Sequence, residues 1–251
     1  MTFKDHFSAR SSVYARYRPH YPDALFEWLA RTSSNRQCAW DSATGSGQAA
    51  IGLARWFESV VASDASERQV ANARVHPSVT YLVSLSEKTP IPDSGVDLVF
   101  MAQALHWLDV NAFYDEVRRV SRPAALIAIC SYSLMKIDPL IDERVDEFYD
   151  GVLGDYWPVE RRHIDAHYLD LPFPFEAIPC PGFEMRHDWD LSELLGYVGT
   201  WSAVQRFEQE RGRDPMLMFA ETIASSWGKA TNRRTVTWPL HLRVGKVHAL
   251  S

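Results

Sequence analysis

Short apolar runs alternate with segments of helical periodicity through the first half of the chain. The run at 95–105 is continuously apolar, which is typical of a parallel strand buried on both of its faces. An alternation of strands and helices predicts a parallel sheet covered by helices. The apolar runs that we interpret as strands lie at 38–41, 59–64, 79–83, 95–105 and 124–132.

Between these runs, apolar residues recur with the spacing of one helix face. Pro22 suits the first turn of a helix over 22–30, where Leu25, Phe26 and Leu29 share a face. Ser66 is a plausible N-cap for a later helix. The other predicted helices span 48–57, 66–74 and 110–121.

After Tyr132 the pattern changes. Helical spacing returns near 138–151, 192–207 and 215–227, and 183–191 and 235–245 have the pattern of two more strands. The segment 171–183 is rich in proline and is expected to be extended or looping. We find no internal repeat and no domain boundary. The prediction is one domain over 1–251, with an N-terminal arm at about 1–21 and a lid or insertion at about 131–180.

Composition narrows the class of protein. The chain has 251 residues, of which 46% are hydrophobic, and a formal net charge of −6. This balance gives no general reason to expect a nucleic-acid partner. The scattered Cys38, Cys130 and Cys180 predict neither a disulfide framework nor a metal site. Because the chain shows no signal sequence and no long apolar span, we expect a soluble, unexported, cytoplasmic protein with no membrane partner.

The candidate chemistry begins at "DSATGSG", residues 41–47, between the first predicted strand and its helix. In an open α/β sheet this turn commonly cradles a ligand. Asp64 ends the next strand, where a carboxylate can accept hydrogen bonds from a ribose diol. Asp41 would repel a pyrophosphate but would favour the cationic amino-acid part of S-adenosylmethionine. Charge therefore favours the sulfonium cofactor over a dinucleotide.

Several motifs together resemble the class I S-adenosylmethionine-dependent methyltransferases. They are "VYARYRPHYP", "WDSATGSGQAA", "ASDAS", "PDSGVDLVFMAQALHWLD", "YDEVRRVSRP", "TWSAVQRF" and "WPLHLRVG", which extend over nearly the whole chain. Within this family the sequence is most similar to the small-molecule type that includes trans-aconitate methyltransferase. The resemblance implies an open, Rossmann-like, mostly parallel seven-stranded sheet with helices on both faces, in which the last-inserted strand is antiparallel. It also implies methyl transfer from S-adenosylmethionine, with S-adenosylhomocysteine as product.

The resemblance also assigns cofactor contacts residue by residue. The methionine part would lie against the turn, the ribose against Asp64, and the adenine beside the residues that follow the second and third strands. The implied cofactor residues are Tyr14, Arg18, Asp41, Ala43, Gly45, Gly47, Asp64, Ala65, Ser66, Ser86, Glu87, Gln103 and Ala104. Two departures stand out. Ala43 replaces the usual glycine two residues after the acid, and "SRPAA" at 121–125 replaces the common "LRPGG".

Each candidate also has a structural interpretation. The acids Asp41 and Asp64 could serve only to cap helices. His106 and Trp107 follow the fourth strand, where an acceptor would lie, but both could be ordinary packing residues. The remaining candidates have the same two interpretations, substrate contact or structure and surface. They are Tyr21 in the arm, the aromatic residues Trp157 and Trp201, and the run Arg161, Arg162 and His163, which either is solvated or binds the carboxylate of an acidic substrate.

The predicted function is methyl transfer to a small-molecule acceptor at oxygen, either a carboxylate or a hydroxyl. A carboxylate needs no base, whereas a hydroxyl or amine does, and His106 is the catalytic candidate for that role. The chain has no Asn/Asp-Pro-Pro-aromatic signature of amino-group methylation, which favours oxygen. The alternatives are a non-catalytic S-adenosylmethionine-binding protein, a nicotinamide-dependent oxidoreductase, and a methyltransferase that acts on RNA or protein.

Overall fold

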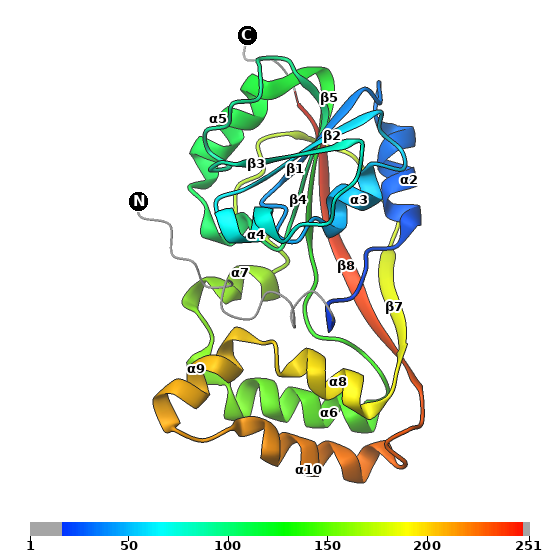
Figure 1. The fold of residues 1–251 in the computed structure, drawn as a ribbon, viewed down its shortest axis with the longest axis vertical. Helices are drawn as coiled ribbons and strands as arrows, with labels where there is room; N and C mark the ends of the chain where they lie inside the picture. Colours follow the sequence, from blue (N-terminus) through cyan, green and yellow to red (C-terminus); the bar gives the residue numbers. More distant parts are fainter. Residues whose placement is uncertain (1–16, 248–251) are drawn as a thin grey trace.

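A central β-sheet with helices on both sides forms one end of the molecule, and a layer of helices forms the other (Figure 1). The computed structural model describes residues 17–247. In this part of the chain, no helix is both long and apolar enough to cross a membrane. Helix α5 covers one side of the sheet, and α2 and α3 cover the other (Figure 1).

Five parallel strands make up the first part of the sheet, in the order β3-β2-β1-β4-β5. Alternate residues of β4 face opposite sides: Leu98 and Phe100 belong to the core under α2 and α3, and Val99 and Met101 to the core under α5. This confirms the strand buried on both faces. The strand bounds are β1 (Cys38–Ser42), β2 (Ser59–Asp64), β3 (Val79–Val83), β4 (Val96–Ala102) and β5 (Ser121–Ser131).

The helices between these strands occur where the periodicity predicts them, but two are shorter. Helix α3 ends at Leu53 because Arg55 and Trp56 donate to carbonyls only three residues back. Beyond α4 the backbone N–H of Arg74 donates to Ser46, in the glycine turn, instead of continuing a helix. The bounds are α2 (Asp23–Thr32), α3 (Gln48–Leu53), α4 (Glu67–Ala71), the 3-10 turn η2 (Leu105–Trp107) and α5 (Val110–Val120).

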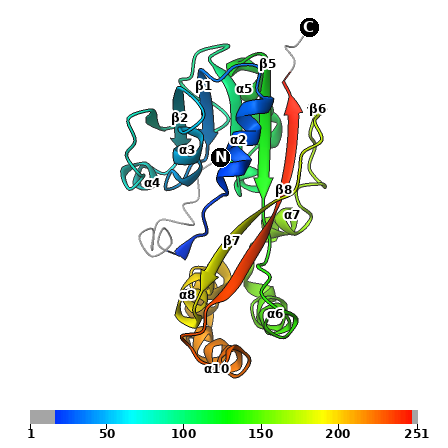
Figure 2. The ribbon, with the colours of Figure 1, turned by 90° about the vertical axis from the view of Figure 1, so that its right-hand side faces the viewer.

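The last strand, β8 (Arg234–Lys246), joins the two ends of the molecule (Figure 2). Its second half runs antiparallel to β5, and its first half runs antiparallel to β7 (Phe183–Trp189). Strand β8 is therefore the antiparallel member of the mixed seven-stranded sheet, as the resemblance implies. A further two-residue strand, β6 (Glu176–Ala177), pairs with the end of β8.

The helical layer contains one correction to the predicted elements. The single helix expected at 192–207 is two helices, because the chain turns at 199–201 and Trp201 has an extended backbone. The elements are α6 (Pro139–Asp146), the π-helical η3 (Glu147–Val152), the 3-10 turns η4 (Gly154–Tyr156) and η5 (Val159–Arg161), α7 (Arg162–Asp165), α8 (Leu191–Val198), α9 (Ser202–Arg211) and α10 (Pro215–Trp227).

The segment 131–180 is built into the core. Ile164 and Tyr168 are buried, and the rings of Phe173 and Phe175 pack against Tyr114 of α5. The Tyr114 hydroxyl donates a hydrogen bond of 2.9 Å to the carbonyl of Pro172. A replacement of this segment by a flexible linker would therefore remove core packing as well as any cover over the acceptor.

Candidate active site

The turn between β1 and α3 lies where the strand order reverses, between β1 and β4. Ala43, Gly45 and Gly47 all have left-handed backbones, with φ of 55°, 56° and 79°. A Cβ on Gly47 would collide with the hydroxyl of Tyr81, whereas a Cβ on Gly45 would meet no described atom within 4 Å. Gly47 is therefore required by the fold itself, and Gly45 borders open space.

The two departures from the family pattern both have left-handed backbones, which favour glycine. Ala43 has a φ of 55°, and Ala124, in the turn before the apolar part of β5, has a φ of 63°. Each left-handed alanine costs about 1 kcal/mol relative to an ordinary backbone. The two turns thus accept alanine at a modest energetic cost.

Asp64 ties this turn to the next helix. One carboxylate oxygen accepts the backbone N–H of Gly45 and the other accepts that of Ser66, both at 2.9 Å. Ser66 in turn caps α4 through the N–H of Gln69. The predicted N-cap Ser66 is therefore confirmed. Asp64 lies at the carboxyl end of β2, where the resemblance places the ribose, and Ala65 lies between Asp64 and Ser66.

Asp41 is 2% exposed and lies beneath the turn. Burial, with a smaller contribution from the charge of the neighbouring Asp64, raises its pKa to about 7, and the hydrogen bond from the Thr44 hydroxyl opposes the shift. The carboxyl is therefore close to half protonated at neutral pH. A cation placed next to it would favour the ionised form.

A buried hydrogen-bond acceptor lies after β3. Ser86 is buried and hydrogen-bonded to the hydroxyl of Ser42 at 2.8 Å. One carboxylate oxygen of Glu87 accepts the backbone N–H of Asp109 at 3.2 Å, and the other is buried without a hydrogen-bond partner among the described residues. A carboxylate oxygen only accepts hydrogen bonds, so it suits a ligand amino group. These residues fit the adenine edge that the resemblance places here.

Gln103 directly follows β4 and has a left-handed φ of 58°. Its backbone N–H donates to Cys130 at 3.0 Å, and its side-chain nitrogen donates to the carbonyl of Tyr132 at 2.7 Å. The side-chain oxygen is buried and has no partner among the described residues. The next residue, Ala104, is 9% exposed. Gln103 therefore lies between the residues predicted to bind the cofactor and the space beyond β5.

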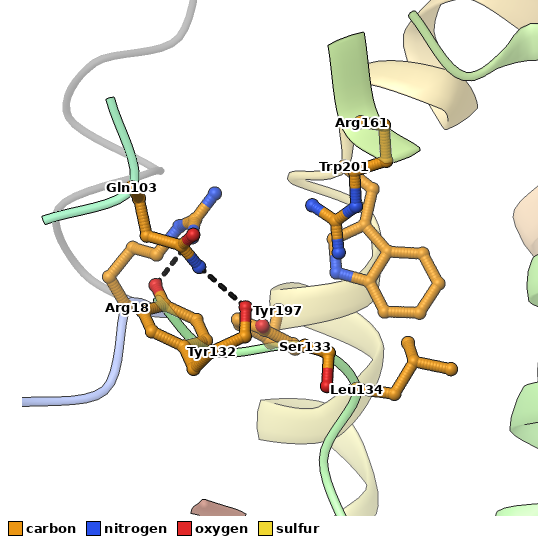
Figure 3. Close-up of a pocket in the computed structure, with 8 residues that line it drawn as sticks. All are labelled: Arg18, Gln103, Tyr132, Ser133, Leu134, Arg161, Tyr197 and Trp201. Carbon is orange, nitrogen blue, oxygen red and sulfur yellow. Dashed lines mark hydrogen bonds between the residues drawn. The ribbon is translucent and has the colours of Figure 1, made fainter. Parts of the chain in front are cut away.

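That space is a small pocket, partly open to solvent. Arg18 donates to the Tyr132 hydroxyl at 2.7 Å on one side, and Arg161 and Trp201 lie on the other (Figure 3). The lining residues are Arg18, Gln103, Tyr132, Ser133, Leu134, Arg161, Tyr197 and Trp201. None of these eight is a histidine or an acid.

The structure brings some predicted residues to this pocket and leaves others outside its lining. Arg18, Gln103 and Trp201 line it, and so does Arg161, which the sequence left open between a solvated run and a substrate contact. Sequence reasoning missed Tyr132, Ser133, Leu134 and Tyr197, which follow β5 or lie in α8. A search for polar and aromatic side chains directly after the fifth strand would have found the first two.

His106 is a poor candidate for a general base. A hydrogen bond of 2.8 Å joins its Nδ1 to the hydroxyl of the buried Tyr168. Burial lowers its pKa to about 3, with smaller contributions in the same direction from Arg161 and His163. Such an imidazole is neutral and weakly basic at physiological pH. The structure therefore does not support the catalytic role considered for His106. The ring of Trp107 packs 4.6 Å from it, measured between ring centroids.

The other aromatic candidates have structural partners. Tyr21 packs edge-to-face against Phe26, Phe100 and Tyr132, so its ring supports the pocket residue Tyr132. Trp157 donates to the carbonyl of Tyr149 at 3.1 Å and does not appear among the lining residues. Tyr14 lies outside the described residues. Within the described range 17–247, no group of three or more histidines, cysteines or acids is arranged to hold a metal ion.

Comparisons with known proteins identify the family of this chain. The sequence profile described as "Methyltransferase domain" matches residues 40–129. The chain is 32% identical to a Dictyostelium discoideum protein named as a methyltransferase, covering 97% of this chain and 95% of that protein. It is also similar to the solved structure of a type II methyltransferase from Anaeromyxobacter dehalogenans, at 42% identity with a TM-score of 0.88, covering 93% of this chain and 99% of that one.

A more distant structure shares the fold alone. A methyltransferase from an antibiotic biosynthesis pathway of Anabaena variabilis has a TM-score of 0.55 at 16% identity, covering 87% of this chain and 98% of that one. Together with the nearer relatives, the matches define the class. The chain belongs to the S-adenosylmethionine-dependent methyltransferases, which confirms the fold, the enzyme class and the cofactor predicted from sequence.

Proposed function

We propose that this protein transfers a methyl group from S-adenosylmethionine to an oxygen atom of a small-molecule acceptor bound in the pocket between Gln103 and Trp201. The observation that carries the proposal is the chemistry of the lining. Among the described residues 17–247 it contains two arginines, no histidine and no acid, and His106 nearby is only weakly basic. A carboxylate acceptor arrives ionised and needs no base, so this lining favours a carboxylate over a hydroxyl or an amine.

The residues present fit the cofactor. Asp64 would hold the ribose, the unpartnered oxygen of Glu87 would accept the adenine amino group, and Asp41 would face the ammonium group. Open space beside Gly45 allows close approach of the ligand. When bound, S-adenosylmethionine supplies a methyl group already activated on a positively charged sulfur.

The protein's contribution to the rate is alignment. Methyl transfer is an in-line displacement, so the residues at the junction have to hold the acceptor oxygen close to the cofactor and in line with it. Gln103 lies at that junction, pinned by Tyr132 through its side-chain nitrogen. Its strained backbone is consistent with a functional position.

The test is methyl transfer from radiolabelled S-adenosylmethionine to a panel of small carboxylic acids, alcohols and amines. A carboxyl methyl ester releases volatile methanol in mild base, whereas a methyl ether or a methylamine does not. We expect base-labile product with one or more of the acids. Base-stable methylamine as the only product, or methylation of RNA or protein alone, would contradict the proposal. Similarity to trans-aconitate methyltransferase in particular stays a prediction, and this panel can include that acid.

A further inference from the structure

Contacts with three neighbouring side chains fix one side of the guanidinium group of Arg161. Its Nε donates to the Tyr149 hydroxyl at 2.9 Å and lies 3.8 Å from a carboxylate oxygen of Asp165. The guanidinium carbon also lies 4.9 Å from the ring centroid of Trp157, over its face. A stacked and tethered guanidinium has lost most of its rotamer freedom before any ligand binds, which makes it a rigid donor.

The other side of the same group faces the pocket. Arg161 is a lining residue, and neither of its terminal nitrogens donates a hydrogen bond to any residue within 17–247. Its side chain is 23% exposed, so the charge is partly withdrawn from water. The paired N–H groups of a guanidinium match the two oxygens of a carboxylate in spacing and geometry. The wall next to it is the indole of Trp201, with Leu134 close by (Figure 3).

We propose that Arg161 is the specificity residue of this enzyme, and that it selects small apolar monocarboxylic acids by binding the carboxylate that is methylated. This inference rests on the proposed function and names the acceptor class for that site. The apolar part of the acid packs on Trp201 and Leu134, while the terminal nitrogens of Arg161 hold the carboxylate toward Gln103.

The charge balance of the reaction gives this arrangement a second consequence. A carboxylate oxygen donates an electron pair to the methyl carbon, the carbon–sulfur bond breaks, and its electrons remain on sulfur. The anion and the sulfonium cation become a neutral ester and a neutral thioether, and no proton moves. Arg161 thus binds the charge that the reaction removes. Its ion pair with the acceptor is lost at turnover, so the ester leaves a site that still attracts a fresh acid.

The experiment compares trans-cinnamate, phenylacetate and sorbate with their amides and methyl esters, by ligand-observed NMR in the presence of S-adenosylhomocysteine. Wild-type protein is expected to bind at least one acid tenfold or more tightly than its amide and ester. Arg161→Gln should abolish that preference, and Arg161→Lys should keep only part of it because the planar fork is lost. Tyr149→Phe keeps the charge but frees one anchor, and should weaken acid binding three- to tenfold.

Arg162→Gln is the matched control, since Arg162 is the exposed neighbour on the same turn, and it should bind acids like the wild type. Calorimetry with S-adenosylmethionine on every variant separates the two proposals. If the cofactor binds and an ester forms, but Arg161→Gln makes it at the wild-type rate, the selection role is wrong and the function stands. The inference is also overturned if no acid binds the wild type more tightly than it binds Arg161→Gln. If no O-methyl product forms with any acceptor, the proposed function itself fails.

Discussion

The cofactor edge and the acceptor pocket meet at Gln103 but are built in different ways. The cofactor edge consists of short segments that follow parallel strands, and it offers carboxylates, backbone and a glycine turn. The acceptor pocket is assembled from the chain before α2, Gln103 after β4, the chain after β5, the turn η5, helix α8 and the turn before α9, and it offers guanidinium and aromatic groups. One region therefore suits a cation and a nucleoside, and the other suits an anion with an apolar body.

This contrast carries a physical lesson about where such an enzyme can change. The cofactor residues are fixed by the sheet, because Asp64 and the turn hold each other through backbone hydrogen bonds. The acceptor residues project from separate helical segments, so each can be replaced without altering the strands. We therefore expect variants on the two sides to separate cleanly into cofactor effects and acceptor effects.

The largest expected effect is on the cofactor side. Asp64→Ala should weaken S-adenosylmethionine binding by about 1.5–3 kcal/mol, roughly 10- to 150-fold, the range for hydrogen bonds to a charged group. Asp64→Asn keeps one oxygen acceptor and should lose less. Calorimetry measures both affinities, and binding of carboxylic acids measured separately should not change. Wild-type cofactor affinity in Asp64→Ala would remove the ribose role and break the division between the two regions.

A second test asks whether His106 can act as a base on the acceptor side. The pKa of His106 is lowered to about 3 in the folded state, mainly by burial, so between that value and about 6.5 only the unfolded chain binds its proton. The stability that His106 contributes is present at pH 7 and is lost as pH falls. From pH 7 to 5 the free energy of unfolding should drop by about 2 kcal/mol through this residue.

Urea unfolding at the two pH values measures this drop, with His106→Asn as the comparison. The pKa values of His20, His187 and His241 are also lowered, chiefly by burial, so the wild-type slope includes their contributions. The informative quantity is therefore the difference between wild type and variant. If both proteins lose the same stability, His106 titrates normally, and it returns as a candidate base for a hydroxyl acceptor.

A smaller effect distinguishes the two glycines of the turn. Gly47→Ala must displace Tyr81, whose hydroxyl donates to the carbonyl of Arg74 at 2.7 Å, and should destabilise the protein by about 2 kcal/mol. Gly45→Ala has only its left-handed backbone to oppose it and should cost about 1 kcal/mol. Its Cβ enters the open space beside the turn, so cofactor affinity should fall tenfold or more. Thermal unfolding should show the larger loss of stability in Gly47→Ala, and calorimetry should show the larger loss of cofactor affinity in Gly45→Ala. Equal cofactor affinities in both variants would mean that the turn is only structural.

The same contrast explains what the sequence could predict. The strands and the turn were predictable, because they depend on contiguous apolar patterning and on one local motif, whereas the antiparallel strand was expected only from the resemblance to the family. The length of α3 was not, because its last turns are stopped by local hydrogen bonds at Arg55 and Trp56 that leave no mark in the periodicity. The position of Arg161 was not predictable either. Its neighbour Arg162 is exposed, and only the tertiary contacts with Tyr149 and Trp157 turn one of the two arginines inward.

The smallest expected effect concerns Asp41, which is buried and has a pKa of about 7. If the ammonium group of the cofactor binds beside it, the nearby positive charge lowers this pKa, so the carboxyl loses the proton that it carries about half of the time at pH 7. Binding should then release roughly half a proton per molecule at pH 7, more at pH 6 and almost none at pH 8.5. Calorimetry in two buffers of different ionisation enthalpy measures the number of protons. Asp41→Asn, which cannot ionise, should abolish the release while it keeps the shape of the side chain. A release that persists in Asp41→Asn would assign the proton to another group and leave Asp41 as a residue that only caps the turn.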